Sequence, residues 1–186
     1  MPNIRQSSTR PAGGRQASSG FTLIELMVTV AVVGILAVVA VPAMTGLINA
    51  NRINSASDNL TAALQLARSE AIRRGTSVTV CASNDGQACA STTSWNRWIV
   101  RGRDNVASEA GSEVIDILRD ETPAGSIELQ GPANGLVFRS SGLLDSEQQL
   151  VVCMPTSQPA DNQRQITVML SGGHRTDKAN GGGACP

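Results

Sequence analysis

Hydrophobic and polar positions follow different patterns in three stretches of the chain, and the first stretch is almost wholly apolar. Between Phe21 and Val41 every residue is apolar, Gly or Thr, except Glu25. A helix over this run is about 31 Å long, which matches the hydrocarbon core of a bilayer. Buried core helices are usually shorter or carry a polar stripe, and cleaved signal peptides have a shorter apolar region that ends in an A-x-A-like site. The run therefore predicts a membrane-spanning helix that is retained.

The second stretch has the periodicity of an amphipathic helix. In residues 52–75, apolar residues such as Ile53 and Leu60 recur at helical spacing, whereas polar residues such as Arg68 fall mostly on other faces. Gly75 is expected to end this helix, because glycine is common just beyond a helical C-terminus. The apolar face is expected to pack on a sheet.

The third stretch alternates or runs apolar in short segments separated by Gly, Pro, Asn and Asp, which is typical of strands and turns. The segment between residues 130 and 136 is expected to be a turn that joins two strands. One helix packed on an antiparallel sheet, an α+β fold, is the predicted architecture. The predicted strands are residues 76–82, 95–101, 113–119, 126–130, 135–139, 149–154 and 164–170.

Charge is unevenly distributed although the formal net charge is zero. Residues 1–20 contain Arg5, Arg10 and Arg15 and no acidic residue, so 12 of the 15 basic residues and all 15 acidic residues lie beyond them. Basic residues beside a membrane span stay on the cytoplasmic side, so the chain from about residue 49 onward is expected on the far side. A net acidic domain also argues against a general nucleic-acid-binding surface.

Four cysteines lie beyond the apolar run, which favours disulfide bonds in an oxidising compartment. The competing interpretation is a zinc site, but the cysteine spacings match no common zinc pattern, and the single histidine, His174, is not a near neighbour of a cysteine in the sequence. No metal site is therefore predicted. Four cysteines allow three pairings, of which we favour Cys81–Cys89, closing a local loop, and Cys153–Cys185, holding the C-terminal tail.

Catalytic chemistry has little support in the sequence. His174 lies in a Gly-rich tail without a Ser or Cys nucleophile motif around it, and no phosphate-binding glycine loop precedes a helix. No catalytic residue and no cofactor are predicted. The protein is expected not to be an enzyme.

Glu25 is the unusual residue of the apolar run. A carboxylate within a membrane span is unfavourable without a cationic partner, and the run contains no Lys or Arg. Either Glu25 lies close enough to the interface to remain hydrated, or another chain supplies the cation.

The junction G-F-T-L-I-E-L-M-V around Gly20 and Phe21 resembles the leader junction of type IV pilins and type II secretion pseudopilins. This resemblance implies cleavage after Gly20 by a prepilin peptidase and N-methylation of Phe21. It also implies that Glu25 pairs with the N-terminal amine of a neighbouring subunit during assembly. The implied regions are a cleaved leader in residues 1–20, a transmembrane and assembly helix in residues 21–48, and a periplasmic globular domain in residues 49–186.

The second half resembles the GspH/FimT group of minor pilins and pseudopilins through VTVCASNDGQAC, WNRWIVRGRD, GLVFRSSGLL and LVVCMPTS…RQITVMLSGGHR, in that order. The resemblance implies a type IV pilin-like fold and a minor pilin that primes or caps a pilus together with other major and minor pilins. It places the protein first in the inner membrane and then in the filament. A minor pseudopilin of a type II secretion system is the alternative.

Some FimT-type pilins take up DNA through a C-terminal G-R-x-R motif, and the matching place here reads G-H-R-T, Gly173 to Thr176. DNA is therefore a candidate partner through a local basic patch, while the alternative is that these charges only solvate the tail. The candidate residues for contacting DNA are Arg101, Arg103, Arg164, His174, Arg175 and Lys178.

Two tryptophans supply the large aromatic side chains of this region. If residues 95–101 form a strand, the three-residue offset puts Trp95 and Trp98 on opposite faces. One indole is then expected in the core, and the other is expected to be exposed, or covered by a loop, where an exposed ring is able to stack on a base.

Overall fold

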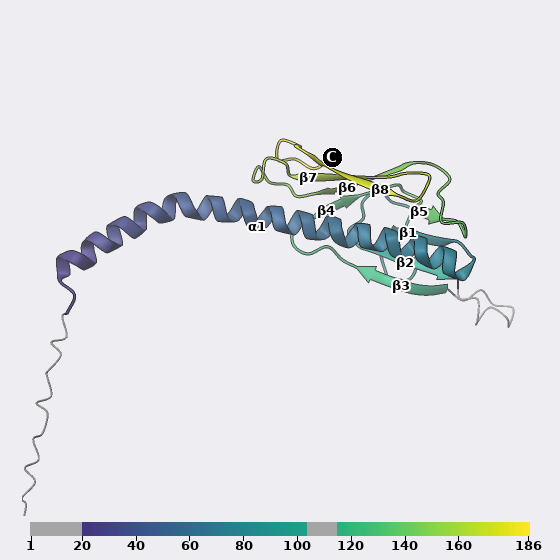
Figure 1. The fold of residues 1–186 in the computed structure, drawn as a ribbon, viewed down its shortest axis with the longest axis horizontal. Coiled ribbons are helices and arrows are strands. Elements are labelled where there is room, and N and C mark those ends of the chain that lie inside the picture. Colours follow the sequence, from purple (N-terminus) through teal and green to yellow (C-terminus); the bar gives the residue numbers. More distant parts are fainter. Residues whose placement is uncertain (1–19, 104–114) are drawn as a thin grey trace, which may run out of the picture. The chain divides into compact units, whose positions relative to one another are not determined.

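A computed structural model describes residues 20–103 and 115–186 of the 186-residue chain, so the predicted leader lies almost wholly outside the described residues. The chain forms two compact units, one up to Ala40 and one from Val41 to Pro186. Helix α1, Leu23–Arg74, contributes residues to both. The eight described strands belong to the second unit (Figure 1).

The first unit consists of the N-terminal part of α1. Thr22 caps its start, because the side-chain oxygen Oγ1 accepts a hydrogen bond of 3.2 Å from the backbone N–H of Glu25. The large apolar side chains between Leu23 and Val38 whose burial is described are exposed. Among the described residues, no helix meets the combined length and hydropathy of a membrane-crossing segment.

In the second unit α1 is amphipathic, as predicted. Ile53, Leu60 and Leu64 lie on its buried face. The helix ends at Arg74, and Gly75 follows with a φ of +67°, a left-handed conformation that glycine adopts without strain. The predicted helix and its glycine stop are confirmed.

The strands form two four-stranded antiparallel sheets instead of the single sheet expected. Strand β1 pairs with both β2 and β5, whereas β6 pairs with β4 and β7. Along the described strands the chain therefore changes sheet three times, after β3, after β4 and after β5. Alternation along a strand predicts which face is buried but not which strand lies beside it, so the sequence did not reveal this division. The first sheet has the order β3 (Ile115–Glu121), β2 (Trp98–Arg103), β1 (Val78–Ala82) and β5 (Leu136–Phe138). The second has the order β4 (Glu128–Gln130), β6 (Gln148–Cys153), β7 (Gln163–Val168) and β8 (His174–Ala179).

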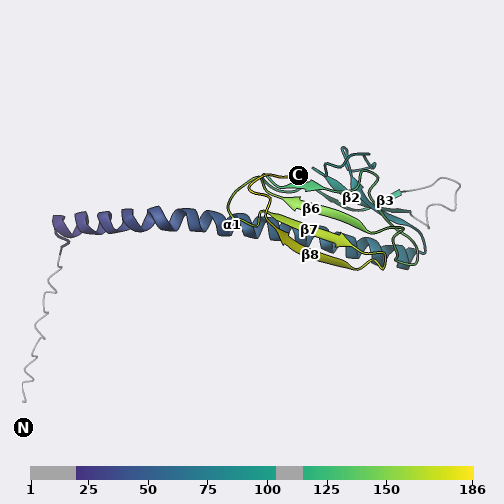
Figure 2. The same ribbon diagram turned by 90° about the horizontal axis from the view of Figure 1, so that it is seen from above.

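One hydrophobic core joins the second part of α1 to both sheets. Leu60 from α1, Phe138 from the first sheet and Ile166 from the second are all fully buried members of this core. Figures 1 and 2 show β6, β7 and β8 on one side of the helix and β2 and β3 on another. The prediction of an α+β fold with a helix packed on antiparallel strands is confirmed.

Strand β8 corrects the prediction that His174 and its neighbours belong to a tail. The strand pairs with β7 along its whole length, from Val168↔His174 to Gln163↔Ala179. Gly172, with a φ of +76°, lies in the turn between the two strands. Because β8 is the edge of its sheet, most of its side chains are exposed, and the apolar alternation that predicts a strand is missing.

The C-terminal residues are held in place by polar contacts and a cross-link. Asn162 is fully buried, and its side-chain amide donates hydrogen bonds to the carbonyl oxygens of Met154 (2.9 Å) and Ala184 (3.1 Å). Its side-chain oxygen accepts a hydrogen bond from the backbone N–H of Gly181 at 2.8 Å. The structure forms the disulfide bonds Cys153–Cys185 and Cys81–Cys89, which are the pairs that we favoured from the sequence.

Trp95 and Trp98 are both buried, with exposed fractions of 0% and 2%, so of the two alternatives for the second indole, exposed or covered by a loop, the exposed one is wrong. The strand begins only at Trp98, and Trp95 lies in the preceding segment, where its backbone N–H donates to the carbonyl oxygen of Leu129. The offset argument assumed one continuous strand and does not apply across this irregular segment.

Candidate assembly and binding sites

The N-terminal segment presents an acidic side chain among exposed apolar ones. Phe21 is 83% exposed, and Gly20 and Glu25 are also exposed. Within residues 20–103 and 115–186, the carboxylate of Glu25 has no hydrogen bond or ion pair. This segment therefore offers a negative charge and apolar surface that the described part of the chain does not satisfy.

Arg164 is withdrawn from the candidate DNA-binding residues. Only 4% of the residue is exposed, and its guanidinium donates to Asn54 Oδ1 at 2.9 Å and to the carbonyl oxygens of Asp161 and Gln163 at 2.9 and 2.8 Å. Burial lowers its pKa. The side chain links β7 to α1 inside the domain and cannot reach a phosphate group without leaving these partners.

The remaining candidates fall into two groups on different sheets. His174, Arg175 and Lys178 lie on β8, and Arg175 forms an ion pair of 2.8 Å with Asp177 on the same strand. Arg101 and Arg103 lie on β2 of the other sheet. Figure 2 shows β8 along one side of the domain and β2 on the other. The structure therefore does not gather the candidates into one basic patch.

His174 does share a groove with an arginine that we did not single out from the sequence. The groove has a volume of about 510 Å³ and lies between α1 and the turn before β8. Arg68 on α1 and His174 both line it, and none of the described residues that line it is acidic. A side chain at Gly172 would collide with the carbonyl of Gly142 and with Arg68, so the turn requires glycine to approach the helix. The sequence places Arg68 on the polar face of the predicted helix, where arginine is common, so nothing in the pattern marks it as a binding residue.

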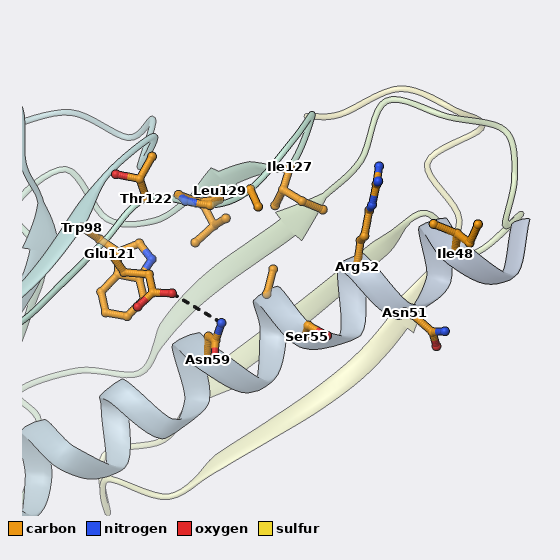
Figure 3. Close-up of a pocket in the computed structure, with 13 residues that line it drawn as sticks. Ile48, Asn51, Arg52, Ser55, Asn59, Trp98, Glu121, Thr122, Ile127 and Leu129 are labelled. Carbon is orange, nitrogen blue, oxygen red and sulfur yellow. Dashed lines mark hydrogen bonds between the residues drawn. The ribbon is translucent and has the colours of Figure 1, made fainter. Parts of the chain in front are cut away.

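A second groove lies beside an earlier part of the same helix, from Ile48 to Asn59 (Figure 3). Its volume is about 350 Å³, and it is lined by α1, by Trp98 of β2, and by residues 121–129, which run from the end of β3 into β4. Ile127 and Leu129 form part of its apolar lining, and Arg52 and Glu121 are its charged residues. Because these residues come from distant parts of the chain, no local sequence pattern indicated the groove.

Three other carboxylates are held ionised by neighbouring donors. Hydrogen bonds from Arg73 and Arg74 lower the pKa of Glu70 to about 2. The Arg97 guanidinium lowers the pKa of Asp120. In the loop closed by Cys81–Cys89, the backbone N–H groups of residues 88 and 87 lower the pKa of Asp85. Glu70 lies near the end of α1, Asp120 lies on β3, and Asp85 lies in the disulfide-closed loop, so each ionised group stabilises the element that contains it.

Comparison with known proteins places these features in a family. The family "Type II transport protein GspH" matches residues 56–173, and the prokaryotic N-terminal methylation motif matches residues 15–41. The chain belongs to the GspH family. This membership confirms the resemblance inferred from the sequence, and the methylation motif spans Gly20, Phe21 and Glu25.

The solved structure of a type IV minor pilin agrees with the fold of this GspH-family protein. The crystal structure of the type IV minor pilin FimU of Pseudomonas aeruginosa matches with a TM-score of 0.51 and 22% identity, over 68% of this chain and 89% of that chain. The minor pseudopilin EpsH of the type 2 secretion system of Vibrio cholerae matches with a TM-score of 0.49 and 18% identity, over 68% of this chain and 97% of that chain. No curated protein sequence matches significantly.

Proposed function

We propose that this GspH-family protein is a minor pilin of a type IV pilus, which enters the filament through the N-terminal part of α1 and acts in priming or assembly near the tip. The observation that carries the proposal is that the methylation motif continues into α1, from Leu23 onward, and that the large apolar side chains described there are exposed. Burying this surface among neighbouring helices or in lipid removes it from water, which is favourable.

The proposed processing begins in the inner membrane, with the globular domain in the periplasm. A prepilin peptidase cleaves after Gly20, and the new N-terminus at Phe21 is methylated. The amine of Phe21 in a neighbouring subunit then supplies the cation for Glu25, whose carboxylate has no partner among the described residues. Pairing the two charges lowers the cost of placing each in an apolar environment.

The alternative within the same family is a minor pseudopilin of a type II secretion system, which the name of the matching family favours. Both functions use the same processing and the same helix. They differ in the neighbouring subunits, so identifying the proteins that cross-link to the full chain in its native cell separates them. Pilins among the partners support the pilus, and pseudopilins support the secretion system.

Replacing Glu25 tests the assembly proposal. The Glu25→Ala variant of the full chain is expected to lose its leader normally but to be depleted at least about tenfold from sheared filaments, because an unpaired N-terminal amine remains in the apolar assembly. The control is Glu70→Ala, on the same helix, which removes a carboxylate paired within the chain. Normal incorporation of Glu25→Ala would contradict the proposal.

DNA binding is a second candidate activity, because Arg68 and His174 line one groove without an acidic neighbour among its described lining residues. The test is binding of duplex DNA by the full chain in detergent at two salt concentrations, beside an Arg68→Glu variant and an Arg175→Glu/Lys178→Glu variant. Phosphate contacts predict binding that weakens with salt and is lost in both variants. Absence of binding at low salt would exclude this activity.

A further inference from the structure

The groove shown in Figure 3 combines an apolar floor with a polar helix edge. Trp98, Ile127 and Leu129 are 2%, 8% and 2% exposed and belong to the hydrophobic core, so the floor of the groove is formed by core side chains. On the helix side, Ser55 and Asn59 are exposed and stand one turn apart, because residues four positions apart lie on the same face of a helix. The groove therefore offers both apolar contact and hydrogen-bonding side chains.

The charges of the groove are not balanced. Glu121 is already engaged, because Arg119 forms an ion pair with it at 3.3 Å and the amide of Asn59 donates a hydrogen bond to it at 3.5 Å. Arg52 is exposed, and in the part of the chain that the structure describes it has no hydrogen bond or ion pair. Figure 3 shows its side chain extended away from α1. The groove thus presents one unopposed positive charge beside an apolar floor.

The shape of the rim depends on the loop after β3. Gly125 adopts a φ of +72°, and a side chain placed there would lie 4.0 Å from the guanidinium of Arg52. The loop therefore passes close to Arg52 while leaving its guanidinium exposed. A partner that enters the groove meets the floor and the cation together.

We propose that this groove binds a segment of a neighbouring filament subunit in which a carboxylate stands next to an apolar side chain. The carboxylate pairs with Arg52, and the apolar side chain fills the cavity over Trp98 and Ile127. The volume of about 350 Å³ suits a side-chain anchor rather than a whole helix. The inference rests on the proposed function, because the partner is a subunit of the same filament.

A protein segment fits the groove better than a free amphiphile such as a fatty acid. A fatty acid also brings a carboxylate and an apolar chain, but it leaves the hydrogen-bonding groups of Ser55 and Asn59 without partners from the ligand. A peptide backbone supplies both donors and acceptors that pair with side chains along the helix edge. The two occupants give different products in a cross-linking experiment.

The test uses the full chain in its native cells, with Ser55 replaced by the photo-crosslinking amino acid benzoylphenylalanine. After irradiation, sheared filaments are collected and the cross-linked peptide is identified by mass spectrometry. The matched control places the same amino acid at Asp58, which is exposed on the same helix but does not line the groove. The expected product at residue 55 is a subunit peptide with Asp or Glu beside an apolar residue, and residue 58 is expected not to yield this product.

Two charge variants make the result specific to Arg52. Arg52→Glu is expected to lower the cross-link yield at residue 55 at least about tenfold, because reversing one charge of an interfacial pair is strongly unfavourable. Arg52→Lys keeps the charge and is expected to retain most of the yield. A yield that Arg52→Glu leaves unchanged, or a cross-link to lipid, would overturn the inference.

The same sample separates this inference from the proposed function. If the chain is present in filaments but forms no cross-link at residue 55, the groove does not bind a neighbour and the proposed function stands. If the chain is absent from filaments while other subunits are present, the proposed function fails, and the inference fails with it.

Discussion

The two parts of α1 use the same kinds of residue in opposite ways. In the N-terminal part, Leu36 is 62% exposed, whereas Leu64 in the C-terminal part is 2% exposed. Each part also contains a glutamate. Glu70 is held by Arg73 and Arg74, while Glu25 has no such partner among the described residues.

This difference shows which interactions the chain satisfies by itself. The C-terminal part of α1 buries its leucines against two sheets and neutralises its glutamate within one helical turn, so it belongs to a self-contained domain. In the N-terminal part, the apolar side chains are not buried and the glutamate is not paired within the described residues. The two parts are therefore expected to respond differently to the same substitution.

The largest expected difference comes from removing a leucine from each part. Leu64→Ala is expected to lower the free energy of unfolding of the domain by about 3–5 kcal/mol, because it removes buried apolar contacts and leaves a cavity. Leu36→Ala is expected to change it by less than about 0.5 kcal/mol. Urea unfolding of the full chain in detergent, followed by the fluorescence of Trp95 and Trp98, measures both. Equal losses would mean that the N-terminal part is packed within the same cooperative unit.

The second test concerns the cross-links, which are confined to the C-terminal unit. Replacing Cys153 and Cys185 by Ser is expected to cost about 3.7 kcal/mol, because the loop that they close spans 32 residues in sequence. Replacing Cys81 and Cys89, which are 8 apart, is expected to cost about 2.5 kcal/mol. The same urea measurement applies. A reversed order would show that contacts in the shorter loop, such as those of Asp85, matter more than chain entropy.

The smallest expected change in the free energy of unfolding comes from replacing each of the two glutamates. Because folding lowers the pKa of Glu70 from 4.5 to about 2, its contribution to stability is fully present above about pH 4.5 and is lost as the pH falls toward about 2. Glu70→Gln is expected to lower the free energy of unfolding by about 1 kcal/mol at pH 7, a modest value because the group is near the surface. The variant is also expected to flatten the pH dependence of stability between these values.

Glu25→Gln is the matched control for that experiment. It removes the same charge from the same helix, but from a carboxylate without a partner among the described residues. The unfolding free energy of the domain is expected to stay the same across this pH range. A change as large as that of Glu70→Gln would show that Glu25 is coupled to the domain.

The sequence predicted α1 and most strands well, because apolar periodicity reports directly on buried faces. It failed where tertiary context determines structure. Strand β8 carries polar side chains because it is an edge strand. Trp95 is buried although it belongs to an irregular segment, which is hydrogen-bonded to β4, and not to a strand.

The candidate sites show the same limit. The N-terminal methylation motif is contiguous and was recognised from its residues. The Arg52 groove is assembled from α1, β2 and the segment between β3 and β4, so only folding brings its residues together. Arg164 looked like a surface cation in the sequence, but the oxygen atoms that accept its hydrogen bonds come from Asn54 on α1, from Asp161 and from Gln163 at the start of β7.

The free edge of β8 has a bearing on aggregation. An unpaired strand edge is a template on which another chain is able to add a strand, and flat apolar edges promote sheet-to-sheet aggregation. Here the edge carries Arg175, Asp177 and Lys178, all exposed, and charged side chains on an edge strand discourage such pairing. The charged edge of β8 therefore disfavours the strand-by-strand addition that leads to amyloid-like deposits.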